Sequence, residues 1–142
     1  PVLGDGRLML EREPPQGFDL LAMDAFSGDS IPTHLLTLEA FEAYRRHLAP
    51  QGWLAVHITN RYLDLRPVMA AAARHLGRVA LLLELPSGHA DPYCRRSWWV
   101  LFVTPAQAAA LPPALQGGEV LAARSGFRPW TDTFSNLFDI LR

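Results

Sequence analysis

The chain has 142 residues, 49% of them hydrophobic, which predicts one soluble globular domain over residues 1–142 with a sizeable core. Its net charge of −1 gives no reason to expect nucleic acid or a charged membrane surface as a partner, and no segment approaches the ~18 uninterrupted apolar residues of a membrane span. All 13 basic residues are arginine, which excludes lysine-based Schiff-base and phosphate-loop chemistry within the chain, and the single cysteine, Cys94, excludes an internal disulfide.

Strand-like apolar stretches alternate with helical patterns along the chain, which predicts an α/β domain. The chain begins at Pro1 without a signal peptide, so we interpret it as a piece of a longer protein in a reducing, cytoplasmic compartment. In chain order we expect a turn at 4–6, a short helix over 7–13, strand 20–23, helix 38–48, strand 53–58, helix 64–76, strands 79–85 and 98–103, a short helix 105–111, a mostly irregular stretch 112–126 and a helical tail 130–141.

The expected strand 20–23 is the most informative element, because it delivers a carboxylate to the point where the backbone leaves the sheet. Its continuous apolar run predicts burial on both faces. Asp24 follows directly, and the Gly/Ser/Asp/Pro turn after it carries Ser27 and Asp29. Ligands of open α/β sheets bind beyond the carboxyl ends of strands, so Asp24 is placed to meet a substrate. The alternative is that both carboxylates only serve the turn, which is their commoner use.

A histidine near the end of the next expected strand is a second candidate. His57 lies inside the apolar segment 53–58. We expect this strand to run parallel to strand 20–23, so that Asp24 and His57 meet at one edge of the sheet. A partly buried structural histidine is the alternative.

Local signals predict where the helices begin and end. Thr37 is expected to cap the helix over 38–48, and Asp64 the following helix, which tolerates Pro67 in its first turn. Gly77 is expected to end that second helix.

The C-terminal third predicts a hairpin and a docking helix. Strands 79–85 and 98–103 are joined by a loop too short for a crossover helix, so we expect them to pair antiparallel. In the tail, helical spacing predicts one apolar face formed by Trp130, Phe134, Leu137, Phe138 and Leu141.

Other chemistries lack their sequence patterns. The five histidines show no His-x-x-x-His spacing, and the chain has no Cys-x-x-Cys pair, so we expect no metal site. No serine lies in a Gly-x-Ser-x-Gly elbow. The chain also lacks a Gly-x-Gly-x-x-Gly loop, so that, if the domain binds a nucleoside, its main phosphate- or methionine-binding loop is expected upstream of Pro1.

Taken together, these segments resemble the spermidine synthase family, the aminopropyltransferases built on an S-adenosylmethionine-methyltransferase fold. The turn 4–6 looks like the family's Gly-Asp-Gly/Ala turn, and 18–24 resembles its Tyr-Asp-Val-Ile strand with the acid that follows. Segment 48–52 is similar to its Leu-x-Pro-Gly-Gly turn, and 85–88 to its Tyr-Pro-Ser-Gly. The tail 130–137 is similar to a bacterial branch often fused behind a membrane-transporter-like region. The resemblance implies the C-terminal half of a Rossmann-like methyltransferase fold, with parallel strands ending in an antiparallel hairpin.

The resemblance implies a role for each candidate residue. Asp24 would accept a proton from the attacking amine, and Asp5 would hydrogen-bond the adenine amino group. Residues on the nucleoside side would be Asp5, Gly4, Gly6 and Ala25. Residues on the amine side would be Ser27, Asp29 and His57.

The same resemblance implies the ligands. S-adenosylmethionine or its decarboxylated form would be a co-substrate, with no tightly bound cofactor. The partners would be a small nucleoside and an amine, without nucleic acid. The resemblance also allows a homo-oligomer. It allows a membrane region upstream in the parent protein, which would place this domain at the cytoplasmic face of that membrane.

Three positions depart from the family pattern. Ser27 stands where a second aspartate is expected, Leu85 where the family has an amine-binding tyrosine, and His57 where it usually has glutamine. Each lost polar contact to a buried amine costs roughly 1–3 kcal/mol. We therefore expect an altered amine pocket and leave the acceptor open.

Three functions stay open at this point. The first is transfer of an aminopropyl or other alkyl group, for which these 142 residues alone are expected to be inactive. The second is an S-adenosylmethionine-dependent methyltransferase on the same fold. The third is a non-catalytic domain that kept the fold, which Leu85 and Ser27 favour.

Overall fold

The computed structural model describes residues 3–25, 32–86 and 96–142. Its elements are, in chain order, α1 (Gly6–Arg12), β1 (Phe18–Met23), the 3-10 helix η1 (Thr33–Leu35), α2 (Leu38–His47), β2 (Leu48–His57), α3 (Arg66–His75), β3 (Val79–Leu85), β4 (Ser97–Val103), α4 (Pro105–Ala109), η2 (Pro113–Leu115), β5 (Glu119–Val120) and η3 (Phe138–Ile140).

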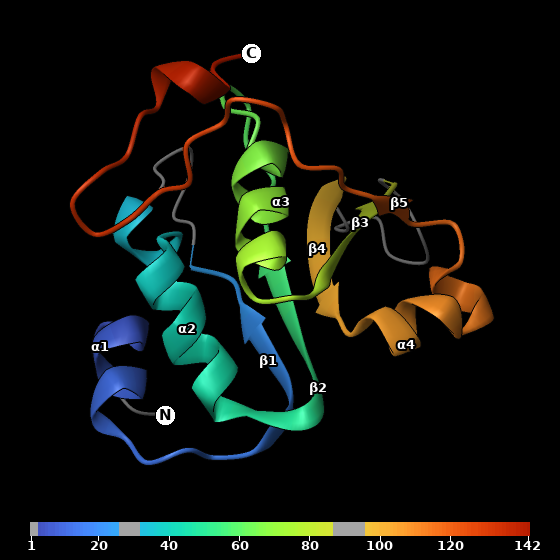
Figure 1. Ribbon diagram of the computed structural model, residues 1–142, viewed down its shortest axis with the longest axis horizontal. Coiled ribbons are helices and arrows are strands. Elements are labelled where there is room, and N and C mark those ends of the chain that lie inside the picture. Colours follow the sequence, from blue (N-terminus) through green and yellow to red (C-terminus); the bar gives the residue numbers. More distant parts are fainter. Residues whose placement is uncertain (1–2, 26–31, 87–95) are drawn as a thin grey trace.

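The described strands form one mixed sheet in the order β1-β2-β4-β3-β5 (Figure 1). β1 and β2 are parallel, whereas β4 is antiparallel to both β2 and β3, and β5 is antiparallel to β3. The α/β class, the parallel pair and the antiparallel hairpin are therefore confirmed. The short strand β5 lies within the stretch that was expected to be mostly irregular.

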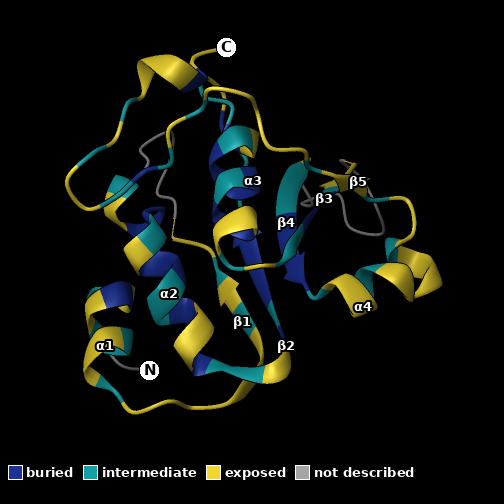
Figure 2. Cartoon of the chain, viewed as in Figure 1, coloured by how far each residue is buried: buried dark blue, intermediate teal, exposed yellow. Residues whose placement is uncertain are grey.

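The two faces of the sheet are covered unequally. Helices α2 and α3 lie across one face, where Phe41, Leu54, Met69 and Phe102 belong to the main core (Figure 1). A smaller cluster on the other face centres on Leu81, with partly buried side chains from α4 and η2 packed against it. This second layer reaches β3 and β4 but leaves β1 largely uncovered (Figure 2).

The predicted burial of β1 on both faces is wrong. Leu21 and Met23 pack against the main core, but Leu20 is 57% exposed and Ala22 is also exposed. The cause is the position of β1 at the edge of the described sheet, where only one face is covered. The apolar run is real, but its second face has no covering layer in the described part of the chain.

Helix boundaries follow the predicted caps with one change. The Thr37 hydroxyl accepts from the Ala40 backbone N–H at 3.3 Å, as expected. Leu65, not Asp64, is the N-cap residue of α3, and the Asp64 carboxylate instead accepts from the backbone N–H and the guanidinium of Arg66. The pKa of Asp64 is lowered chiefly by that guanidinium.

Gly77 ends α3 as predicted. Its φ is +62°, a left-handed conformation that glycine adopts without steric cost. The backbone N–H of Arg78 donates to the Ala73 carbonyl at 2.8 Å, and that of Gly77 to the Arg74 carbonyl at 3.3 Å. This is the Schellman arrangement that satisfies the last carbonyls of a helix.

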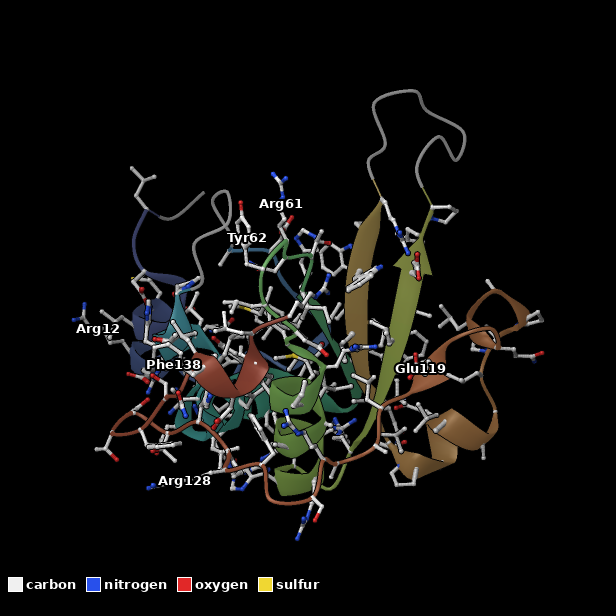
Figure 3. All side chains as sticks on the ribbon, turned by 90° about the horizontal axis from the view of Figure 1, so that it is seen from above. Arg12, Arg61, Tyr62, Glu119, Arg128 and Phe138 are labelled. Carbon is white, nitrogen blue, oxygen red and sulfur yellow. The ribbon has the colours of Figure 1, made fainter. Side chains whose placement is uncertain are left out.

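The predicted tail helix over 130–141 is wrong. Only the 3-10 helix η3 forms there, and Phe138 on it is 84% exposed (Figure 3). Trp130 does dock, with 1% exposure, and Ile140 is buried as well. The tail backbone bonds partly to distant segments, as where the Leu38 N–H donates to the Trp130 carbonyl at 2.9 Å, and partly across a local bridge between Thr131 and Phe134. These bonds take the place of a helical ladder.

Among the described residues, no helix has the length and apolar character needed to cross a membrane.

Gly52 allows β1 and β2 to approach each other. The register shifts between Phe18, which pairs with Leu48, and Leu20, which pairs with Trp53. At this irregularity a Cβ on Gly52 would collide with the Phe18 carbonyl oxygen and crowd the Ala49 backbone.

We predict that Gly52→Ala lowers the free energy of unfolding by about 1–3 kcal/mol, because the obstructing atoms are backbone and cannot move aside. Urea unfolding measures the change. Gly117→Ala is the matched control, since a Cβ there meets nothing within 4 Å. Equal stability of the two variants would show that β1 and β2 do not need a glycine at position 52 to pack together.

Candidate functional site

The carboxyl ends of β1 and β2 bring two predicted residues together. The parallel register pairs Ala22 with Ala55 and Met23 with Val56, so Asp24 and His57 follow side by side. His57 Nδ1 lies 2.7 Å from Asp24 Oδ1. The expected juxtaposition is confirmed, whereas the chemical roles of both residues stay predictions.

His57 is held on its other nitrogen and on one ring face as well. Its Nε2 lies 2.6 Å from the Thr59 hydroxyl oxygen, which also accepts from the backbone N–H of Trp98 at 2.8 Å. The Trp99 ring stacks on the imidazole with ring centres 4.9 Å apart. The His57 side chain is therefore only 21% exposed, whereas that of Asp24 is 59% exposed.

Thr59 and Trp99 are not predicted by sequence patterns. Thr59 lies two residues after His57. In an extended segment, side chains two residues apart lie on the same face, and this spacing is the only sequence signal for the contact. Trp99 pairs with His57 across β2 and β4, which depends on the sheet order and so leaves no local signal.

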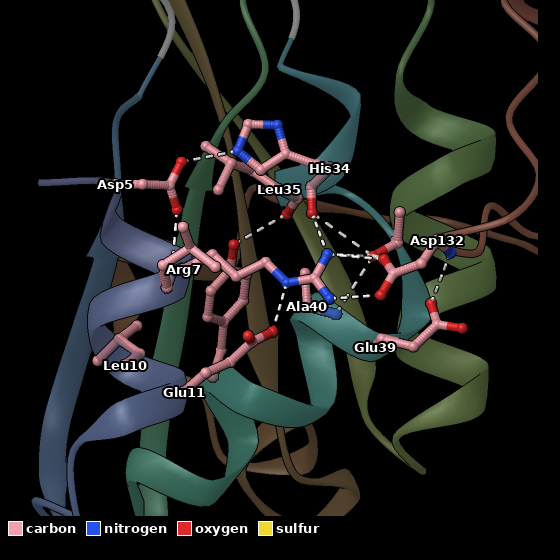
Figure 4. Close-up of polar contacts among 12 residues, drawn as sticks. Asp5, Arg7, Leu10, Glu11, His34, Leu35, Glu39, Ala40 and Asp132 are labelled. Atoms are coloured by element: carbon pink, nitrogen blue, oxygen red, sulfur yellow. Dashed lines mark hydrogen bonds and ion pairs between the residues drawn. The ribbon is translucent and has the colours of Figure 1, made fainter.

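Asp5 occupies a different environment. It caps α1: its Oδ1 accepts from the Leu8 backbone N–H at 2.9 Å, while its Oδ2 lies 2.8 Å from His34 Nε2 (Figure 4). The Leu8 bond, followed by the His34 bond, lowers the pKa of Asp5. Asp5 is the residue predicted to contact adenine, and both of its carboxylate oxygens already have partners within the protein.

The remaining predicted residues have simpler positions. Gly4 precedes the cap with its φ at +154°, Gly6 begins α1, and Ala25 is exposed directly after Asp24. Ser27 and Asp29 lie outside the described residues.

Arg7 forms the centre of a polar cluster beside Asp5 (Figure 4). Its guanidinium donates to both carboxylate oxygens of Asp132, at 2.7 and 2.6 Å, and to Glu11 at 2.7 Å. It also donates to the His34 carbonyl at 2.7 Å, and the Thr37 hydroxyl donates to Asp132 at 2.7 Å. Arg7 is buried, with 8% exposure.

This cluster joins the tail to the residues that precede α2. The His34 carbonyl lies in η1, and Thr37 caps α2. The Tyr44 hydroxyl donates to the Leu35 carbonyl at 3.0 Å in the same stretch, and burial raises the pKa of Tyr44. Neither Arg7 nor Asp132 is predicted by sequence, because 125 positions separate them.

The cluster is strongly charged. The bidentate bond to Asp132 raises the pKa of Arg7, and the same bond, with help from Thr37, lowers the pKa of Asp132. Both groups therefore remain ionised at neutral pH.

No grouping of three or more potential metal ligands occurs among residues 3–25, 32–86 and 96–142.

No protein-family model matches the chain, and neither does any curated protein. A search of solved structures finds a probable spermidine synthase from Corynebacterium glutamicum, with a TM-score of 0.61 and 25% sequence identity. The match covers 96% of this chain and 55% of that protein, so the chain spans about half the length of the structure it resembles. The likeness supports a spermidine synthase-like fold, and the mixed sheet is consistent with a Rossmann-like methyltransferase-type architecture.

We predict that Asp132→Asn lowers the free energy of unfolding at pH 7 by about 1–3 kcal/mol, because the buried Arg7 keeps Glu11 but loses its bidentate charged partner. The folded-state pKa of Asp132 is depressed, so its contribution is complete above the unfolded-state pKa of about 3.9. The contribution disappears as pH falls through the folded-state pKa.

The stability difference between wild type and Asp132→Asn should therefore be constant near neutrality and shrink below about pH 4. Chemical unfolding across this pH range measures it. Asp139→Asn, which changes an exposed carboxylate of the same tail, is the control. A difference that is independent of pH would contradict the assigned ion pair.

Proposed function

We propose that this chain carries the amine-binding side of a spermidine synthase-like transferase, which moves an aminopropyl group from a decarboxylated S-adenosylmethionine-type donor to an amine. The observation that carries the proposal is the half-exposed Asp24 carboxylate at the carboxyl end of β1, bonded to His57 at 2.7 Å. The likeness to the probable spermidine synthase supports the same reaction class.

The reaction needs an anion beside the amine. The amine nitrogen attacks the aminopropyl carbon attached to the sulfonium, so that a C–N bond forms while the C–S bond breaks. The sulfonium becomes a neutral thioether, and the new ammonium group gives up a proton. A carboxylate at this point orients the amine, stabilises its positive charge and accepts that proton. Asp24 takes this role in the proposal.

The donor side is proposed around Asp5. Each Asp5 oxygen has one bond, from the Leu8 N–H or with His34, and a carboxylate oxygen can accept two, so Oδ2 can meet an adenine amino group beside His34 or in its place. The His34 side chain is 53% exposed and has room to turn outward. Because the match spans 55% of the Corynebacterium protein, we propose that other donor-binding residues lie outside these 142 residues.

We predict that Asp24→Asn in the full-length protein lowers kcat by about 100-fold or more, since the amide cannot accept the amine proton. The assay follows the thioether nucleoside released from decarboxylated S-adenosylmethionine with a panel of amines. Asp19→Asn is the matched control, because Asp19 is an exposed carboxylate near the opposite end of the same strand.

Undiminished activity of Asp24→Asn would contradict the role of Asp24. Absence of a thioether product with every amine would overturn the reaction itself. In that case, calorimetric binding of S-adenosylmethionine but not its decarboxylated form would indicate a methyltransferase instead.

A further inference from the structure

The hydrogen bonds around His57 determine which of its nitrogens carries the proton. An ionised carboxylate is only an acceptor, so its bond with Asp24 Oδ1 at 2.7 Å requires a proton on Nδ1. A neutral imidazole then has an acceptor at Nε2, which faces the Thr59 hydroxyl at 2.6 Å.

The environment of Thr59 is consistent with that assignment. Its oxygen accepts from the Trp98 backbone N–H at 2.8 Å, which leaves its own proton to donate to His57 Nε2. With this tautomer the bonds run in one direction, from the Trp98 N–H through Thr59 and His57 to Asp24. Chains of this kind polarise each successive bond and favour a single arrangement.

We propose that His57 is a positioning residue for Asp24, and that Asp24 and Thr59 together hold the imidazole as the Nδ1–H tautomer. This inference rests on the proposed transferase function and changes the expected role of His57, which was to bind the amine. With Nδ1 already protonated, the imidazole cannot take the substrate proton from Asp24 through that bond. It holds one carboxylate oxygen and leaves the other directed to the substrate amine.

The proposed tautomer of His57 also bears on the choice of ligand. A protonated imidazole would cancel the charge of the carboxylate it touches, whereas the neutral tautomer leaves Asp24 with its full negative charge. The pair therefore favours a cationic amine over a neutral acceptor. The stacked Trp99 ring, 4.9 Å from the imidazole centre, keeps the ring in the plane that serves Asp24.

The tautomer is measured directly by heteronuclear NMR of histidine-labelled protein above the ordinary titration range of histidine, with His57→Gln identifying the signal. We expect a protonated Nδ1 and a bare Nε2 in wild type, and a weaker preference for this tautomer in Thr59→Val, where the Asp24 bond still selects it but the Thr59 bond is lost. A protonated Nε2 in wild type would overturn the inference. This measurement needs no substrate, so it is independent of whether the transferase activity exists.

Kinetics test the positioning role. His57→Gln retains an N–H for Asp24 and is expected to keep kcat within a few-fold of wild type, whereas His57→Leu should lower kcat by about 10- to 100-fold. His75→Leu, which removes a half-exposed histidine bonded to Glu42 at 3.0 Å, is the matched control. Equal losses in His57→Gln and His57→Leu would show that the imidazole itself is required and would contradict the positioning role. An inactive wild type with the expected tautomer would refute the proposed function and the kinetic role together, while leaving the hydrogen-bond assignment intact.

Discussion

The ion pair between Arg7 and Asp132 is the contact on which the rest of this structure depends. A buried guanidinium is costly unless it is paired and hydrogen-bonded, and here it has partners in α1, before α2 and in the tail. The pair fixes the tail where Trp130 enters the core and accepts the Leu38 N–H. It also holds the backbone at His34, whose ring bonds to Asp5. One contact thus supports both the docking of the tail and the surroundings of Asp5.

The contact between Asp24 and His57 comes from the sheet rather than from the polar cluster. Parallel pairing of β1 and β2 places Asp24 and His57 at one edge of the sheet. Near the amino end of β1, the absence of a side chain at Gly52 accommodates the shift in register. A slip of one residue would move every side chain to the opposite face and separate the two groups. Trp99 enters from β4, which lies between β2 and β3. The site is therefore built on rigid strands, with the exposed carboxylate of Asp24 at their end.

Sequence patterns predicted the features that depend on near neighbours. The Thr37 cap, the Gly77 terminus and the hairpin follow from local chemistry, and the Asp24–His57 contact follows from one general rule for parallel strands. Apart from the cap of α3, which is Leu65 rather than Asp64, the errors depend on non-local contacts. The apolar run of β1 carries no information about its place at the edge of the described sheet, and tail residues with helical spacing bond to other segments instead. Arg7 and Asp132 are distant in the sequence and come into contact only when the chain is folded.

The central claim is that the carboxyl edge of β1 and β2 binds an amine through the charge of Asp24. Titrating the protein with putrescine and with the uncharged butanediol of equal length, followed by backbone amide NMR, tests it most directly. We predict saturable shifts at Asp24, His57 and Thr59 with the diamine only, and their loss in Asp24→Asn. Equal shifts with the diol, or an unchanged response in Asp24→Asn, would contradict the claim.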